Sequence, residues 1–128
     1  MKRAIIGAGA LLALWAILVP SQAMADKAPA EITIDVLDEG GIYSWNGEIT
    51  SPKPTCKKDR KITVYRRNPG KDEKIGSVNS FPSLDPGDHT WYWLVEDPGK
   101  PNGEYYAKAK ATDRCKKAKS PVIGVSPR

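Results

Sequence analysis

Apolar and polar residues alternate in short runs along most of the chain after residue 30. In the first run, Ile32, Ile34 and Val36 fall on one face, with Thr33 and Asp35 between them. A period of two is the pattern of a β-strand with one buried face. The alternation predicts about seven strands, over residues 32–36, 43–50, 62–67, 74–80, 90–95, 105–112 and 121–125.

Turn-forming residues separate these runs, and no run has a helical period of useful length. Residues 38–41 read Asp-Glu-Gly-Gly, and residues 97–103 contain two prolines and two glycines. Short strands separated by turn signals at intervals of roughly 8–12 residues are typical of β-sandwiches. We therefore expect an all-β fold, a single antiparallel Greek-key β-sandwich of about seven strands.

The N-terminal segment has the composition of an export signal. Lys2 and Arg3 precede an uncharged apolar run, and Ala-Met-Ala at 23–25 fits the small-residue rule for signal-peptidase cleavage. The apolar run is shorter than the roughly 20 residues that a membrane-spanning helix needs. We expect a secreted or extracellular protein without a membrane span after cleavage, with a signal peptide at 1–25, a domain at 26–128, and loose ends at 26–30 and 126–128.

Two cysteines, Cys56 and Cys115, lie in the expected exported domain. Exported proteins usually oxidise such a pair, so we expect a disulfide in preference to two buried thiols. In the chain-entropy model, closing a loop of about 60 residues stabilises the fold by roughly 4 kcal/mol. The expected fold is thus held by one disulfide.

Charge is unevenly distributed along the chain. Without Lys2 and Arg3, 18 of the 20 basic residues remain against 15 acidic ones, a net charge of +3. All charged residues in 26–48 except Lys27 are acidic, whereas basic residues follow each cysteine. The disulfide would join these basic segments into one cationic rim, suited to an anionic envelope polymer or a polysaccharide. The alternative is a set of ordinary solvated loops. The rim comprises Lys57, Lys58, Arg60, Lys61, Arg114, Lys116, Lys117 and Lys119.

Nucleic acid is not an expected partner, because the chain is exported and has no known nucleic-acid-binding motif.

Aromatic residues offer a second candidate site. Trp91 and Trp93 share one face of a predicted strand, where they would form either part of the core or an exposed platform for stacking sugar rings. The core is the favoured interpretation, because large aromatic side chains dominate such interiors. If the tryptophans face inward, Tyr92 and Tyr106 are the alternative platform.

Catalytic and metal-binding patterns are weak. His89 is the single histidine, and it has no nucleophile or second titratable partner at a recognisable spacing. One histidine with two oxidised cysteines makes no zinc site. The acidic groups Asp35, Asp38 and Glu39, or Asp85 and Asp88, lack the spacing of a calcium-binding loop. We expect no enzyme, no metal site and no cofactor.

The order of motifs resembles a known group of extracellular modules. Gly-Glu-Ile-Thr-Ser at 47–51 is followed by the strand 62–67, Asp-Pro-Gly at 85–87, Trp91, and Asn-Gly-Glu-Tyr-Tyr-Ala at 102–107. This series is similar to bacterial secreted Ig-like or prealbumin-like sandwiches, of the carboxypeptidase-regulatory-like or collagen-adhesin B-type kind. The resemblance implies a non-catalytic spacer, stalk, or carbohydrate- or surface-binding unit.

Two functional hypotheses follow. The first is a secreted, non-catalytic β-sandwich module that interacts with a surface, a matrix, or a carbohydrate or other anionic polymer. The second is a small secreted effector or inhibitor that binds a surface protein or another protein partner through the loops 81–88 and 97–103. Exposed aromatic or cationic faces favour the first hypothesis, and ordered protruding loops favour the second.

Overall fold

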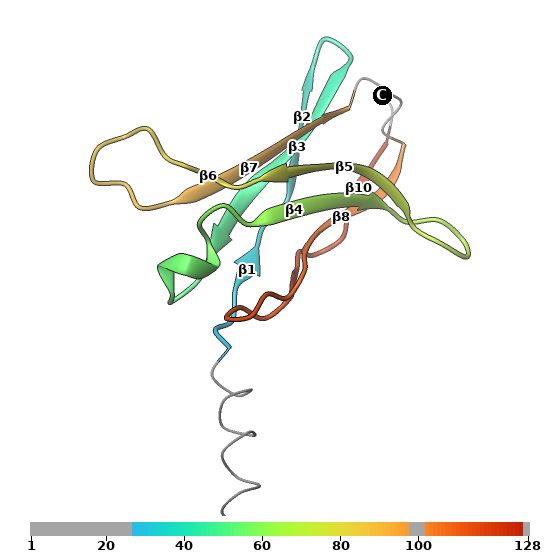
Figure 1. Ribbon diagram of the computed structural model, residues 1–128. Helices are drawn as coiled ribbons and strands as arrows, with labels where there is room; N and C mark the ends of the chain where they lie inside the picture. Colours follow the sequence, from blue (N-terminus) through green and yellow to red (C-terminus); the bar gives the residue numbers. More distant parts are fainter. Residues whose placement is uncertain (1–26, 98–101, 127–128) are drawn as a thin grey trace, which may run out of the picture.

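The computed structural model describes residues 27–97 and 102–126 (Figure 1). These residues form an all-β structure with two antiparallel sheets and a single 3-10 turn, η1 (Pro54–Cys56). The ten strands are β1 (Glu31–Ile32), β2 (Asp35–Glu39), β3 (Ile42–Thr50), β4 (Lys61–Arg66), β5 (Glu73–Asn79), β6 (Phe81–Pro82), β7 (Trp91–Asp97), β8 (Gly103–Ala109), β9 (Ala118–Lys119) and β10 (Ile123–Val125).

The first sheet is built around β3. Its strand order is β1-β3-β7-β6, and β2 also pairs with β3. The β2–β3 hairpin turns at Gly40 and Gly41, both at positive φ, and projects beyond the rest of the molecule at the top of Figure 1. Along the other edge of β3, Trp45 pairs with Val95 of β7.

The second sheet has the order β10-β8-β4-β5, with β9 also paired to β8. Ile62 and Val64 of β4 lie opposite Ala109 and Ala107 of β8. All of these side chains are fully buried, so this face of the second sheet points into the core. The intervening residues of the same strands therefore point outward.

One hydrophobic core joins the two sheets. The first sheet contributes the largest buried side chains, Trp45 and Trp93, and the second contributes Tyr105, whose ring centroid lies 4.7 Å from that of Trp45. The alternation seen in the sequence thus produces one inward face on each sheet. The predictions of an all-β fold and of antiparallel strands are confirmed.

A close backbone approach splits the first predicted strand into two. The segment between β1 and β2 runs along the same edge of β3 as those two strands, and it passes so close to Gly47 that a Cβ atom there would lie 2.0 Å from the carbonyl oxygen of Thr33. That oxygen also accepts a hydrogen bond from Nε1 of Trp93 at 3.2 Å. Glycine is needed at position 47 because no side chain fits between the two backbones. This split, together with the two-residue strands β6 and β9, accounts for the difference from the seven strands predicted.

The disulfide between Cys56 and Cys115 is confirmed, with Sγ atoms 2.01 Å and Cα atoms 5.5 Å apart. It is compatible with a secreted or extracellular protein. Both cysteines are buried with Ala28, which forms a parallel bridge to Cys115. Ala28, in the segment expected to be loose, is held by backbone hydrogen bonds to Arg114 and Lys116.

Three expectations lie wholly or partly outside the described residues. The signal peptide at 1–25 is outside them, as are residues 98–101 of the predicted 97–103 loop and residues 127–128 of the C-terminal end. Within the described residues, no helix is both long and apolar enough to cross a membrane.

Candidate functional site

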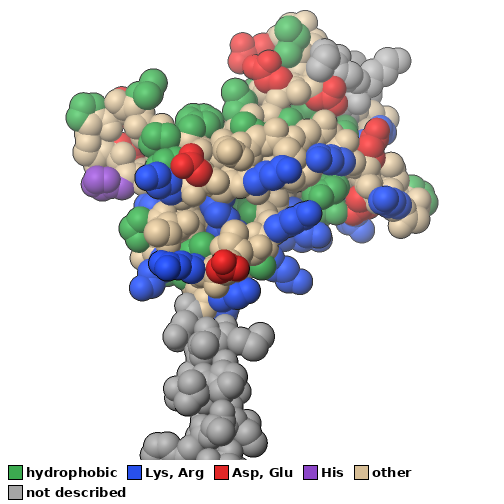
Figure 2. All heavy atoms as spheres, in the orientation of Figure 1, with side chains coloured by type: hydrophobic (Ala, Val, Ile, Leu, Met, Phe, Trp, Pro, Cys, Tyr) green, Lys and Arg blue, Asp and Glu red, His purple; other side chains and the backbone are tan. Residues whose placement is uncertain are grey.

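The outer face of the second sheet carries the most distinctive set of side chains. Register places the outward residues of neighbouring strands side by side: Thr63 lies opposite Lys108, Tyr65 opposite both Tyr106 and Lys74, and Lys108 opposite Lys119. Basic side chains are spread across this side of the molecule in Figure 2. We call this surface the lysine face, defined by Lys61, Lys74, Lys108, Lys110 and Lys119, with Tyr65 and Tyr106 between them.

The lysines of this face have no carboxylate partner among residues 27–97 and 102–126. The two ion pairs in this part of the chain join Arg66 to Glu73 and Arg67 to Glu104, each at 3.8 Å. Lys108 and Lys119 contact the tyrosine rings, and Lys119 also interacts electrostatically with the Asp72 carboxylate. The face thus concentrates positive charge, and none of its lysines forms an ion pair within the described residues.

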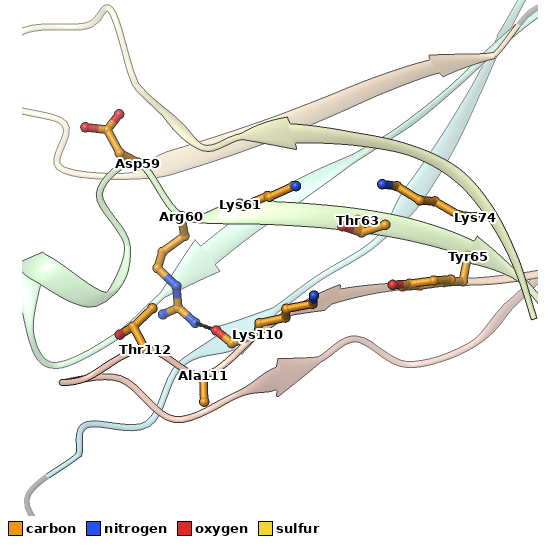
Figure 3. Close-up of a pocket in the computed structure, with 9 residues that line it drawn as sticks. All are labelled: Asp59, Arg60, Lys61, Thr63, Tyr65, Lys74, Lys110, Ala111 and Thr112. Atoms are coloured by element: carbon orange, nitrogen blue, oxygen red, sulfur yellow. Dashed lines mark hydrogen bonds between the residues drawn. The ribbon is translucent and has the colours of Figure 1, made fainter.

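A cavity of about 310 Å³ opens at one end of the lysine face, beside the start of β4 (Figure 3). Lys61, Lys74 and Lys110 line it together with Thr63 and Tyr65. These residues come from β4, from β5 and from the segment just after β8, so the sheet register brings them together. We call this cavity the lysine cleft.

Arg60 lies in the wall of the lysine cleft but is only 4% exposed. Nη1 donates to the carbonyl of Cys56 at 2.8 Å, and Nη2 donates to the carbonyls of Lys110 at 3.0 Å and Lys116 at 3.3 Å. Burial lowers the pKa of the guanidinium, which nevertheless remains charged at neutral pH. The prediction that Arg60 belongs to an exposed rim is wrong, because its side chain ties the disulfide segment to the end of β8.

The tyrosines of the lysine face form a stacked pair. The ring centroids of Tyr65 and Tyr106 are 5.5 Å apart with an interplanar angle of 22°. The Nζ atom of Lys119 lies 4.4 Å from the Tyr106 centroid, and that of Lys108 lies 5.9 Å from the Tyr65 centroid. These cation–π contacts hold lysine side chains above the rings and fix part of the positive charge in place.

Asp72 anchors the tyrosine pair from the side. The hydroxyl of Tyr106 donates a hydrogen bond to the Asp72 carboxylate. This bond raises the pKa of Tyr106 to about 12, with burial as a secondary cause. The same bond lowers the pKa of Asp72, which also accepts from the backbone N–H of Asn68 at 3.3 Å. The Tyr106 phenol thus stays protonated and the Asp72 carboxylate ionised across the neutral range.

The predicted cationic rim is only partly continuous. The disulfide brings Lys57 and Lys58 to the same end of the molecule as Arg114, Lys116 and Lys117. All except Lys57 are exposed, and the Nζ atom of Lys57 donates to the carbonyl of His89 at 3.0 Å. The other two exposed members, Lys61 and Lys119, belong to the lysine face instead.

The alternative interpretation of Trp91 and Trp93, as an exposed platform, does not fit the structure. Trp93 is 1% exposed, and Trp91 is half-buried against the core. The fallback pair is also separated, since Tyr92 lies in the first sheet, near Phe81, and Tyr106 in the second. Trp93 points inward because it shares its side of β7 with Val95, another core residue. The core interpretation of the tryptophan pair is the one that fits.

The remaining candidates, the single histidine and the acidic residues, lie in or next to loops and turns, where aspartates accept backbone hydrogen bonds. His89 is exposed in the connection between β6 and β7. Oδ1 of Asp38 accepts from the N–H of Gly41 at 3.1 Å, and Oδ1 of Asp88 accepts from the N–H of Thr90 at 3.0 Å. Within the described residues, no three His, Cys, Asp or Glu side chains are grouped in a way that could hold a metal ion.

Several residues of the lysine cleft and the lysine face were not predicted from the sequence. Thr63, Tyr65, Lys74 and Lys110 of the cleft, and Lys108 of the face, were not assigned to a site. One signal was present: Lys108 and Lys110 alternate with alanines, which places both lysines on the outer side of a strand. Pairing of β4 with β5 and β8 could not be read from the alternation alone.

Comparison with known proteins supplies no family, because no protein-family model matches the chain and no curated protein matches it significantly. Functional inference for this protein therefore depends on the geometry and charge of the lysine face. Its distinguishing chemistry is a group of unneutralised lysines around a stacked tyrosine pair.

Proposed function

We propose that the protein is a secreted, non-catalytic β-sandwich module that binds an anionic polysaccharide or envelope polymer through the lysine face. The observation that carries the proposal is the group of lysines without carboxylate partners on the outer face of β4, β5, β8 and β9. A Greek-key topology and kinship with Ig-like or prealbumin-like surface modules belong to the same proposal.

An extended anionic polymer suits this surface better than a compact ligand. The lysines are distributed over four strands, so each one can contact a different charged group along a chain. Each exposed contact contributes little because water and salt screen it. Several contacts made together give useful affinity and speed the encounter between the two partners. Binding should therefore weaken steeply as salt is added.

Matched charge variants test the proposal. We expect the quadruple variant K61Q/K74Q/K108Q/K110Q to lose most of its retention on a dextran sulfate column. The control variant K53Q/K58Q/K71Q/K117Q removes the same charge from exposed positions outside the lysine face, and should keep most of the retention. Equal losses in the two variants would contradict a specific face. Wild-type retention that is no weaker at high salt would contradict the electrostatic mechanism.

A second candidate function is binding to a protein partner through the loop 81–88. Leu84 is 96% exposed in this loop, which stands apart from the sheets at the left of Figure 1. Backbone hydrogen bonds from Ser83 to Thr90 at 2.9 Å and from Asp88 to Asp85 at 3.1 Å keep the loop ordered. An ordered loop presenting a leucine fits the effector or inhibitor hypothesis.

One substitution separates the two candidates. Leu84→Ser removes the apolar tip and leaves the lysine face untouched. Under the proposed function, this variant keeps wild-type retention on dextran sulfate. If Leu84→Ser abolishes binding to a purified surface protein that the quadruple lysine variant still binds, the loop is the functional surface.

A further inference from the structure

The lysine cleft brings together three ammonium groups, the kind of donor that binds a tetrahedral oxyanion. Lys61, Lys74 and Lys110 approach it from three different strands or strand ends. Figure 3 shows the ammonium groups of Lys61 and Lys74 directed toward each other across β4, and that of Lys110 directed toward the Tyr65 hydroxyl. Three positive charges from separate parts of the chain thus line one hollow.

We propose that the lysine cleft binds a phosphate or sulfate ester carried by a sugar of the anionic polysaccharide, in preference to a carboxylate. This inference rests on the proposed function, because it names the charged group that the lysine face recognises. Lysine acts as a compact point charge, and three of them match the three free oxygens of a monoester.

A carboxylate is a poorer fit because the cleft has no free arginine fork. Planar carboxylates are best bound by the two parallel N–H groups of a guanidinium. Both Nη atoms of Arg60, the arginine in the wall of the cleft, already donate to backbone carbonyls of Cys56, Lys110 and Lys116. Arg60 thus adds positive potential below the site without presenting a fork to the ligand.

Uncharged groups complete the cleft. The Thr63 and Ser77 hydroxyls bond to each other at 2.8 Å, which gives the floor a polar surface without charge. The Tyr65 hydroxyl has no hydrogen-bond partner within the described residues, so it can donate to a ligand oxygen. The carboxylate of Asp59 is directed away from the lysines in Figure 3. A bound ester therefore meets donors in the interior of the cleft and no facing acid.

The tyrosine pair argues for a saccharide rather than a single-stranded nucleic acid. Nucleic-acid strands are held largely by stacking of their bases on exposed aromatic faces. Here Tyr106 is 7% exposed, and its ring is covered by Tyr65 and Lys119. The Tyr65 ring is half-buried, stacks on Tyr106, and has the Nζ atom of Lys108 5.9 Å from its centroid. Neither ring offers a base-sized stacking surface, and a sugar ester does not require one.

Dextrans that differ only in their charged group test this inference. Dextran sulfate, dextran phosphate and carboxymethyl dextran of equal length and substitution would be titrated calorimetrically at one ionic strength. We expect at least one of the two ester forms to bind about tenfold more tightly than the carboxymethyl form. Comparison of the sulfate and phosphate arms identifies which ester the cleft prefers.

Substitutions of the cleft lysines test whether the preference for an ester over a carboxylate arises in the lysine cleft. We expect K61Q/K74Q/K110Q to bind the ester and carboxymethyl forms with nearly equal affinity. The control K53Q/K71Q/K117Q, which removes the same charge from exposed positions outside the cleft, should keep the preference. All of these lysines are exposed, and the circular dichroism spectrum of each variant verifies that it is folded.

The results distinguish failure of the ester site from failure of the proposed polymer-binding function. If wild-type protein binds all three dextrans equally, the ester site is wrong and the proposed polymer-binding function stands. If it binds none of them more tightly than neutral dextran, the proposed function itself fails. Tighter binding of oligothymidylate than of dextran phosphate would overturn the assignment to a saccharide.

Discussion

Arg60 is a buried charged residue that holds backbone segments next to the lysine cleft in place, although its own side chain is not exposed there. Its guanidinium holds three carbonyls in place, one from the turn at Cys56 and two from the segment that carries Lys110 and Lys116. Because Lys110 lines the lysine cleft, Arg60 acts as a positioning residue for the candidate site. A buried charge that satisfies carbonyls is costly to remove, since the carbonyls then lose their partners.

We predict that Arg60→Met lowers the free energy of unfolding by about 3 kcal/mol, mainly because one buried and two partly buried carbonyls lose their donor. Urea denaturation monitored by tryptophan fluorescence would measure the change. Lys61→Met is the matched control at the neighbouring exposed position, and it should change stability by less than about 0.5 kcal/mol. Equal effects of the two substitutions would contradict the positioning role.

The hydrogen bond between Tyr106 and Asp72 predicts how the stability of the protein depends on pH. Their hydrogen bond lowers the pKa of Asp72 and raises that of Tyr106 to about 12. Its stabilisation is present above the unfolded Asp value of about 3.9 and is lost as pH falls through the lowered folded pKa. On the alkaline side it is present below the unfolded Tyr value of about 10 and is lost as pH rises through about 12.

The Tyr106 pKa can be followed through its ring carbon resonances by NMR. We expect titration near 12 in the wild-type protein. In Asp72→Asn the pKa should fall toward 10, because a neutral amide stabilises the protonated phenol less than a carboxylate does. A Tyr106 pKa that is the same in both proteins would show that the carboxylate is not the cause.

At the scale of elements, the close contact between β3 and the segment linking β1 to β2 depends on Gly47. A methyl group there would overlap the carbonyl oxygen of Thr33. We predict that Gly47→Ala destabilises the protein by more than about 2 kcal/mol, because backbone atoms on both sides must move. Thermal unfolding would measure this change. Gly124→Ala in β10, where nothing lies within 4 Å of the added methyl, is the control. A Gly47→Ala protein as stable as that control would contradict this close contact.

The elements were the most predictable part of the fold. Alternation located most strands because each sheet buries one face, and two cysteines in an expected exported domain were enough to predict the disulfide. The orientation of Trp91 and Trp93 was less predictable, since Tyr92 and Leu94 on the opposite side of β7 are also hydrophobic. Only packing against the second sheet determines which face is inside.

The candidate site was less predictable than the fold for a physical reason. Its lysines are brought together by strand pairing between segments far apart in the chain, such as Thr63 with Lys108. Local runs of charge instead directed attention to residues next to the cysteines. Arg60 belongs to such a run, yet it is buried, because a charge run does not reveal which side chain finds carbonyl partners.

At the scale of the whole molecule, charge is separated between two regions. Acidic side chains gather around the projecting β2–β3 hairpin, which contains Asp35, Asp38 and Glu39, and basic side chains cover the lysine face and the disulfide end (Figure 2). A polarised molecule of this kind orients itself in the field of an anionic polymer before contact. The acidic hairpin would point away from the polymer while the lysine face meets it.

The most direct test of the central claim is NMR chemical-shift mapping of the backbone amides during titration with a short dextran sulfate. Polymer binding by the lysine face predicts that the largest shifts fall on β4, β5, β8 and β9, centred on Lys61, Thr63 and Lys110. The β2–β3 hairpin and the loop 81–88 should stay unchanged. Shifts confined to the loop 81–88 or to residues 114–117, or no shifts at all, would contradict the claim.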